Sequence, residues 1–426
     1  MNVTQLRKLS RHPVILAVYL PSILIGTGLG VLIPILPLYI SSFEVSYGLV
    51  GLVIASRSLG MLLGDVPAGI ILSRISTRGT MVLGIAVTAI TLLAMGLAQT
   101  VVELLIYGLI NGLGQALWNI SRMTYMATTI DVAQRGRAIA IFGGIHRVGA
   151  FVGPLIGGLL AEAFGLRVPI LFTAVLAIVT IVFPLLYVTQ EQMLPEYQAA
   201  HKAKRKTKNA GIAHHLHEIG TIFAEYRQIF MTAGLAQLLA QSIRQGRNVI
   251  IPLYGADVLG LNVLQVSTII SVAAAIDMSL FYPTGEIMDR IGRKFAIVPG
   301  FCIQALGLAL VPFSAMYPGI DGYYGLLFAT MMIGLGNGLT SGTMMTLGSD
   351  LSPKEATSEF IGVWRLIGDT GMTASPVVVG TIAGAAGLGP AALVIAAIGF
   401  IATSIFVMFV PETLKKMAVV GKSVGR

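Results

Sequence analysis

The stretch that decides the fold is G-E-I-M-D-R-I-G-R-K, residues 285–294, which lies between two long apolar segments, 269–282 and 295–311. Two acids and three bases gathered in so apolar a chain indicate a water-facing turn between two membrane helices. Gly285 and Gly292 have no Cβ, so they allow a tight turn and a close approach of helices. The basic residues favour the cytoplasmic side of the membrane.

The composition supports a membrane protein. The chain has 426 residues, of which 55% are hydrophobic and 11% charged, and its mean hydropathy is +0.84. Soluble proteins carry roughly 25% charged residues, so this chain cannot surround itself with water. Its length fits twelve spans of roughly 20 residues with short loops. The net charge of +9 does not indicate nucleic acid, because the bases lie where loops are expected.

Hydropathy predicts an all-α membrane protein in two six-helix bundles, residues 1–188 and 226–426, joined by a cytoplasmic connector at 189–225. We expect spans at about 14–40, 47–72, 80–99, 101–126, 138–163, 168–188, 228–254, 263–287, 295–316, 322–348, 359–386 and 389–410. Basic residues in alternate loops place both termini in the cytoplasm. The connector contains the basic run 202–208 and the histidines His214, His215 and His217. We interpret it as a solvated segment, not a metal or lipid site.

An internal repeat supports the two halves. The tripeptide at 37–39 returns at 252–254, and Pro67-x-Gly69 returns as Pro283-x-Gly285. The sequence Gly-Leu-Gly at 112–114 returns at 334–336, and Gly149…Pro154…Gly158 returns at 371–380. Four matches in the same order indicate two related halves.

The stretch 285–294 resembles the loop motif of the major facilitator superfamily, which joins the second and third helices and recurs between the eighth and ninth. The resemblance covers nearly the whole chain apart from the termini and the connector. It implies alternating access, with the acid and bases of the motif forming ion pairs that latch the cytoplasmic face. The first copy, residues 69–78, has Ser73 in place of the acid, so Asp65 or Asp131 must replace it. The implied gating residues are Asp289, Arg290, Arg293, Gly285, Gly292, Asp65, Gly69, Arg74 and Arg78.

A second motif lies in the fifth span and comprises Gly149, Gly153, Pro154, Gly157 and Gly158. Glycines at four-residue spacing give a flat helix face for close packing, and proline permits bending. The motif is similar to the fifth-helix motif of drug–proton antiporters in the same superfamily, and residues 26–37 are similar to their first-helix motif. The resemblance implies export, whereas ordinary small-residue packing would imply no direction.

Charges inside the spans are the remaining signal. Each central charge costs roughly 2.5–3.5 kcal/mol on insertion scales, so these side chains should face a polar cavity or pair with one another. Arg365 and Asp369 are one helical turn apart and are expected to pair. We expect the proton carrier to be His146, Asp277 or Asp369. The residues expected to shape the substrate site are Arg147, Arg244, Arg247, Arg365, Asn119, Trp118 and Trp364. Core packing is the alternative for the tryptophans. The excess of arginines, which includes Arg57 and Arg122, predicts an anionic or zwitterionic substrate.

The sequence therefore predicts a proton-coupled exporter of small organic molecules in the cell membrane, without cofactor or metal, acting as a monomer. The alternative is an importer or facilitator of an organic anion on the same fold. A membrane-embedded enzyme is disfavoured because the chain has no H-x-x-x-H cluster and no G-x-S-x-G elbow in a polar context. A sensor is disfavoured because the connector and tail are too short for an effector domain.

Overall fold

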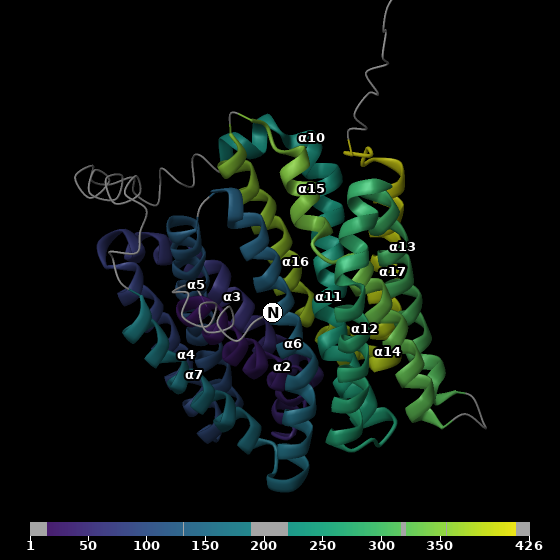
Figure 1. Ribbon diagram of the computed structural model, residues 1–426. Coiled ribbons are helices and arrows are strands. Elements are labelled where there is room, and N and C mark those ends of the chain that lie inside the picture. Colours follow the sequence, from purple (N-terminus) through teal and green to yellow (C-terminus); the bar gives the residue numbers. More distant parts are fainter. Residues whose placement is uncertain (1–14, 131, 189–219, 317–320, 355, 415–426) are drawn as a thin grey trace, which may run out of the picture.

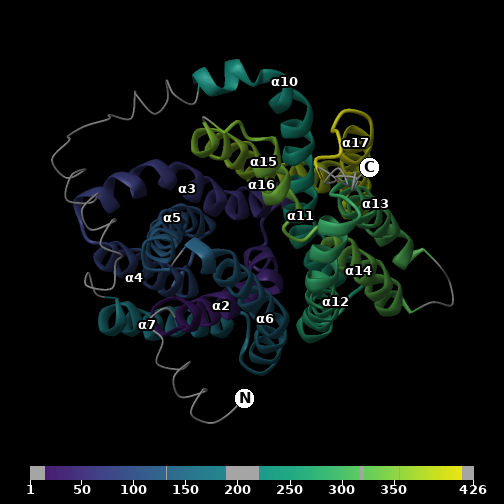
Figure 2. The same ribbon diagram turned by 45° about the horizontal axis from the view of Figure 1, so that its top comes forward.

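The computed structural model describes residues 15–130, 132–188, 220–316, 321–354 and 356–414, and its regular elements are helices. The first group of helices consists of α2 (Leu20–Ser41), α3 (Tyr47–Arg74), α4 (Thr77–Leu97), α5 (Val101–Thr129), α6 (Val132–Phe164) and α7 (Arg167–Tyr187). The second group consists of α10 (Arg227–Ile229), α11 (Leu235–Leu253), α12 (Val263–Arg290), α13 (Lys294–Leu310), α14 (Gly322–Leu339), α15 (Thr343–Leu351), α16 (Thr357–Ala386) and α17 (Leu388–Met408). Figures 1 and 2 show the two groups side by side.

Ten helices in the described ranges are long and apolar enough to cross a membrane. They are α2 to α7, α12, α13, α16 and α17. Helix α11 is absent from this set because it carries two arginines and several amides, and α14 ends early at an interruption. The helices begin at the residues that local chemistry favours. Ser46, Ser76 and Thr100 accept N-cap hydrogen bonds, and Asn262 with Gln265 forms a capping box at the start of α12.

The glycines of the fifth-span motif bring α6 against α2. A Cβ added at Gly153 would lie 2.5 Å from the Thr27 carbonyl oxygen and 2.6 Å from the Gly30 Cα. One at Gly149 would lie 2.6 Å from the Thr27 nitrogen. No side chain fits at this crossing, so the two backbones touch. The close packing expected from the glycine spacing is confirmed, and Pro154 lies within α6.

The two groups meet along two helix pairs, α3 with α16 and α6 with α12. At the lower end of Figure 1 these contacts are again made by glycines: a Cβ added at Gly380 would overlap the Tyr47 carbonyl oxygen, and one at Gly158 would lie 2.6 Å from the Ser267 Cβ. The Tyr47 hydroxyl also donates to Asp257 at 3.0 Å. The two groups are therefore in close contact at the lower end, and at Gly380 the contact is between backbones.

An interruption separates α14 from α15. The predicted single span over 322–348 breaks at residues 340–342, where Gly342 has a φ of +72°, the left-handed conformation that favours glycine. The carbonyl groups at the end of α14 are thereby freed from the helix. They become acceptors close to the middle of the molecule.

The loop motif at residues 285–294 requires glycine at one of its two glycine positions. Gly292 has a φ of +147°, and a Cβ there would lie 2.5 Å from the Glu412 Oε2, so this position requires glycine. The expectation that Gly285 allows a close helix approach is wrong for this conformation, because a Cβ there, as at Gly69, would meet nothing within 4 Å. Gly285 faces open space.

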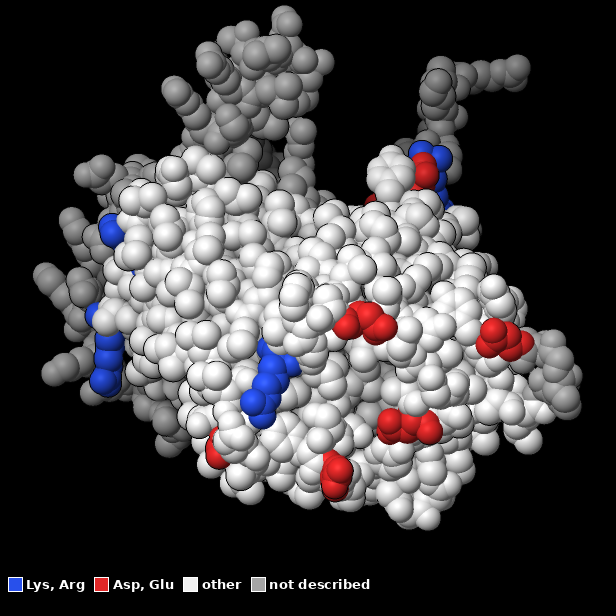
Figure 3. Space-filling model, turned by 90° about the horizontal axis from the view of Figure 1, so that it is seen from below, with Lys and Arg blue, Asp and Glu red and all other residues white. Residues whose placement is uncertain are grey.

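Charge differs between the two ends of the molecule. The upper end of Figure 1 carries the turns after α3 and α12, with Arg74, Arg78 and the 290–294 cluster. Figure 3 views the lower end, where acidic side chains are scattered over a mostly uncharged surface and basic side chains are sparse. This asymmetry matches the distribution expected of a membrane protein with one basic face.

The glycine contact between the groups can be tested with two alanine substitutions on α16. Gly380→Ala places a methyl group against the Tyr47 carbonyl, whereas Gly384→Ala is a matched control, since its Cβ would lie 3.9 Å from the nearest atom. We expect Gly380→Ala to cost about 1–3 kcal/mol through overpacking, and Gly384→Ala to be neutral. Thermal unfolding in detergent measures both. Equal melting temperatures for the two variants would show that the contact is not tight.

Candidate functional site

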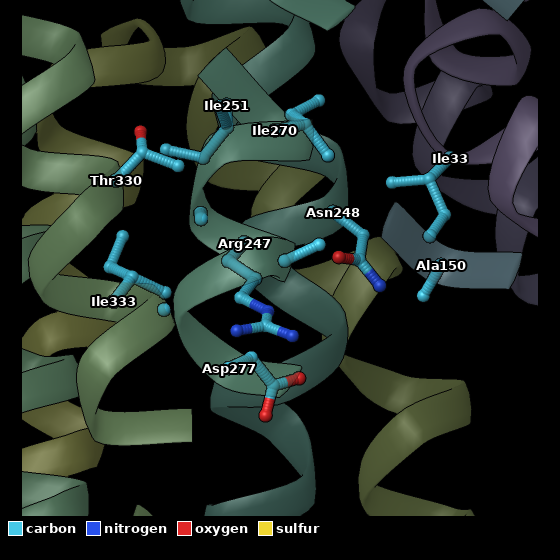
Figure 4. A pocket seen from close by; sticks show the side chains of 12 residues that line it. Ile33, Ala150, Arg247, Asn248, Ile251, Ile270, Asp277, Thr330 and Ile333 are labelled. Carbon is cyan, nitrogen blue, oxygen red and sulfur yellow. The ribbon is translucent and has the colours of Figure 1, made fainter. Parts of the chain in front are cut away.

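A pocket lies between the two helix groups (Figure 4). It contains about 540 Å³ of space outside protein atoms, part of it open to solvent. Ile33 of α2 and Ala150 of α6 line it from the first group, and α11, α12 and α14 line it from the second. Its polar lining consists mainly of Arg247, Asn248 and Asp277. A largely apolar pocket with a few convergent polar groups has the features of a small-molecule site.

An ion pair spans the two groups beside this pocket. Arg147 of α6 donates from Nη1 to the Asp277 Oδ1 of α12 at 2.9 Å, and the two side chains are only 18% and 16% exposed. The Asn337 amide of α14 donates to the other carboxylate oxygen at 2.9 Å. Arg147 also donates to the Ser341 hydroxyl and lies 4.7 Å from the centre of the Phe281 ring. The predicted site residues Arg147 and Asp277 are thus brought together.

Arg247 points into the pocket from α11, next to Asn248 (Figure 4). Its guanidinium lies near Asp277 but forms no ion pair or hydrogen bond with another described residue. The Asn248 carboxamide points towards the first group, near Ala150, and is likewise free of hydrogen bonds within the described ranges. Of the predicted substrate residues, Arg247 is the one that lines the pocket with a free charge.

Arg244 has a structural role, although the sequence suggested the substrate site. Its Nη2 donates to the Thr340 carbonyl at 2.7 Å and to the Thr340 hydroxyl at 2.9 Å, and its guanidinium stacks over Phe301 at 5.5 Å. Gln304 donates to the same hydroxyl at 3.1 Å. A cation at the carboxyl end of α14 satisfies the carbonyl freed by the interruption and complements the helix dipole.

Three other predicted substrate residues pack within the helix groups and not in the pocket. Trp118 is buried on α5, and Arg122 lies 5.4 Å from the centre of its ring and donates to Asn119 at 3.2 Å. Trp364 is buried on α16 and donates to the Met344 carbonyl at 3.0 Å. Core packing, the alternative for the tryptophans, describes both positions.

His146 lies on α6 opposite α2. A Cβ added at Gly26 would lie 3.5 Å from its Nδ1, and Arg122 and Arg147 are its electrostatic neighbours. The residue is exposed. It is adjacent in sequence to Arg147, one partner of the ion pair between the groups.

The expected pair between Arg365 and Asp369 is wrong: these side chains form no ion pair with each other in the described part of the chain. Arg365 is exposed on α16 and is instead an electrostatic neighbour of both Asp369 and Asp65, the latter on α3. The spacing of Arg365 and Asp369 along the helix did not determine whether they pair, because α3 brings a second carboxylate, that of Asp65, near Arg365. The structure thus places Asp65 opposite α16, whereas Asp131 lies outside the described residues.

The loop motif forms its contacts within the second group. Arg293 forms ion pairs with Asp289 at 3.1 Å and with Asp350 of α15 at 3.0 Å. Glu412, just after α17, accepts hydrogen bonds from the backbone N–H groups of Arg293 at 2.9 Å and Lys294 at 3.0 Å. Arg290 pairs with Glu286 on the surface, at 2.8 Å. The turn therefore ties α12 and α13 to α15 and to the end of α17.

Sequence reasoning missed Asn337, Ser341 and Asn248. Each is a polar residue inside or beside an apolar span, which is the signal that selected the charged candidates. Asn337 lies near the end of α14, just before the interruption, and Ser341 lies within it. The connector histidines His214, His215 and His217 lie outside the described residues.

A double-mutant cycle on Arg147 and Asp277 tests the ion pair. Replacing either residue alone by alanine leaves a largely buried charge without its partner, so we expect a coupling energy of about 1 kcal/mol or more in the free energy of unfolding. The exposed pair Glu286–Arg290 within one group is the control, with an expected coupling below about 0.5 kcal/mol. Additive effects at Arg147 and Asp277 would contradict a direct pair.

The Glu412 contacts predict a pH dependence. Burial alone would raise the pKa of the Glu412 carboxyl, but backbone hydrogen bonds from Leu414, Lys294, Arg293 and Thr413 together lower it below its ordinary value. A lowered folded-state pKa contributes stability above the unfolded pKa, about 4.3, and loses it as the pH falls through the folded pKa. We expect the difference in melting temperature between the wild type and Glu412→Gln to shrink as the pH falls below about 4.3 and to disappear below the folded-state pKa. Glu225→Gln, at an exposed glutamate, is the control, and a difference that persists at low pH would refute the role.

Comparison with known proteins identifies the family. The model of the Major Facilitator Superfamily matches residues 18–376. An uncharacterised transporter of the same type from Methanocaldococcus jannaschii is 21% identical over 364 residues, covering 85% of this chain and 89% of the relative. Multidrug resistance protein 1 of Bacillus subtilis is 24% identical over 171 residues, 40% of this chain and 44% of that protein.

A solved POT family transporter in complex with a thioalcohol-conjugated peptide has the same fold. Its TM-score is 0.74 at 14% identity, and the match covers 93% of this chain and 96% of that structure. The match to the family model spans α2 to α15 and the first part of α16, and it includes the ion pair and the pocket between the groups. This chain is a multi-pass membrane protein and belongs to the Major Facilitator Superfamily of transporters.

Proposed function

We propose that this member of a family of secondary transporters exports small organic molecules in exchange for protons, by alternating access. The observation that carries the proposal is the Arg147–Asp277 ion pair between the helix groups, at the edge of a pocket that both groups line. A charge pair at this position breaks when the groups separate, so its energy depends on the conformation. A carboxylate released from its arginine is able to accept a proton.

The proposed arrangement has twelve spans in two bundles, residues 1–188 and 226–426. Helix α11 with its flanking π-helical turns, and α14 together with α15, would complete the ten candidate membrane helices. The excess of basic residues at the turns after α3 and α12 supports a cytoplasmic upper end, with both termini in the cytoplasm of a cell-membrane protein. The protein would act as a monomer, since each chain contains a complete pocket.

Two observations support export. The α6 glycines that touch α2 match the fifth-helix motif of drug–proton antiporters, and part of the chain is similar to a multidrug resistance protein. The proton carrier we favour is Asp277, because it is the acid that lines the pocket and pairs across the groups. His146 and Asp369 are the alternatives, and both lie on helices that contact the opposite group.

The second candidate is an importer or facilitator of an organic anion. The free guanidinium of Arg247 in the pocket favours an anionic substrate and does not depend on the direction of transport. Both candidates use the same pocket. They differ in the direction in which the substrate accumulates, and a facilitator would need no proton gradient.

Transport in inside-out vesicles with an acidic lumen tests the proposal. We expect wild-type vesicles to accumulate members of a panel of labelled organic anions, and to lose them when a protonophore collapses the gradient. Asp277→Asn should abolish gradient-driven accumulation but keep exchange between labelled and unlabelled compound, because exchange needs no net proton transfer. Glu286→Gln, a surface carboxylate outside the pocket, is the control.

Two results would count against the proposal. Uptake by right-side-out vesicles, without accumulation in inside-out vesicles, would replace export by import. Full gradient-driven accumulation by Asp277→Asn would show that another residue carries the proton. The same assay on His146→Ala and Asp369→Asn would then identify that residue.

A further inference from the structure

The charge on Arg247 is available to a ligand. Its guanidinium enters the pocket, and no hydrogen bond or ion pair to another described residue uses it. The other arginines near the centre are occupied, since Arg147 binds Asp277 and Arg244 binds Thr340. A cation held inside a membrane protein without a partner is costly, so a site of this kind favours an anion.

The neighbouring side chain supplies a second donor. Asn248 follows Arg247 on α11, and its carboxamide points across the pocket towards α6 (Figure 4). A guanidinium and an amide N–H on the same wall match the two oxygen atoms of a carboxylate. A ligand bound to both would also touch the first helix group near Ala150. Binding would therefore involve both groups.

The charges in the pocket lining favour a ligand with one negative charge. Arg147 and Asp277 neutralise each other, which leaves Arg247 as the positive charge in the lining. Arg244 also keeps its charge, but it does not line the pocket and is held at Thr340. A monoanion balances the charge of Arg247. A dianion such as a phosphate ester would bring an uncompensated negative charge close to Asp277, where the low polarity strengthens the repulsion.

The rest of the lining is apolar except for Thr330, whose hydroxyl donates to the Leu326 carbonyl. Ile33, Ile251, Ile270 and Ile333 face the pocket together with alanines and a glycine. Burial of apolar ligand surface against them contributes roughly 25 cal/mol per Å². An organic group beside the carboxylate would lie against these side chains, and part of the pocket is open to solvent.

We propose that the pocket binds amphipathic organic monocarboxylates, with the carboxylate on Arg247 and Asn248 and the apolar part against the isoleucines. This assignment rests on the proposed transport function and names its substrate class. Lipophilic cations and polyanions are excluded as preferred substrates. Arg247 is the residue that determines specificity for charge.

Equilibrium binding to the full chain in lipid nanodiscs tests the assignment, with empty nanodiscs as the background. The probes share one apolar group: labelled cinnamate, its neutral amide, the cinnamyl ammonium ion and the doubly ionised styrylphosphonate. Acrylate, which lacks the ring, tests the apolar contribution. We expect cinnamate to bind at least about tenfold more tightly than each of the others, the difference that one charge-assisted hydrogen bond accounts for.

Variants assign the effect to the residue. Arg247→Gln should weaken cinnamate binding at least about tenfold and leave the amide unchanged, whereas Arg290→Gln removes the same charge from an exposed position and should change neither. Arg247→Lys keeps the charge if the glutamine variant does not fold. Equal binding of cinnamate and its amide, tighter binding of the phosphonate, or unchanged binding to both Arg247 variants would overturn the assignment.

The binding assay is independent of transport. Selective cinnamate binding without gradient-driven transport in vesicles would leave the substrate class standing and refute the coupled exporter. Gradient-driven transport of cations, without cinnamate binding, would refute the substrate class and leave the exporter standing.

Discussion

The arrangement depends on one constraint, which is that charges inside a membrane protein must find partners. Arg147 and Asp277 are 130 positions apart in the chain, on helices that belong to different groups, and neither charge is stable in a span on its own. Their pairing fixes how α6 faces α12. The amide of Asn337 and the hydroxyl of Ser341 complete the contacts of this pair, so α14 and its interruption are held at the same place.

The interruption of α14 follows the same logic. A helix that ends inside the protein leaves carbonyl oxygens without donors, and Arg244 supplies one to the Thr340 carbonyl. Two of the buried arginines thus stabilise helix geometry and the contact between groups. Arg247 differs from them because its guanidinium has no hydrogen bond or ion pair to a described residue, in a pocket whose lining is mostly apolar. Arg147 and Arg244 therefore belong to the structural framework, whereas Arg247 belongs to the proposed binding site.

The sequence predicted the helices well because hydropathy and glycine spacing are local signals. Every predicted span overlaps a helix, and the fifth-span glycines pack closely against neighbouring helices as their spacing indicated. Partners of charged residues were predicted less well. Arg365 and Asp369 satisfy the helical spacing for a pair, yet Asp65 of another helix also faces Arg365, and only the packing of α3 against α16 reveals it. The roles of Arg244 and Arg247 could not be separated either, since both occupy the same face of α11.

The contacts between the two groups differ in kind along the molecule. At the lower end they are backbone contacts at glycines, which depend on shape and are lost as soon as the helices separate slightly. At the centre they are the charge-assisted hydrogen bonds of Arg147. Its guanidinium can exchange one acceptor for another at little cost, whereas a buried guanidinium without an acceptor is costly. A ligand carboxylate or a proton changes the charges at the centre without touching the glycines. A ligand in the pocket would therefore act first on the Arg147–Asp277 ion pair. The glycine contacts at the lower end would change only if the helices then move.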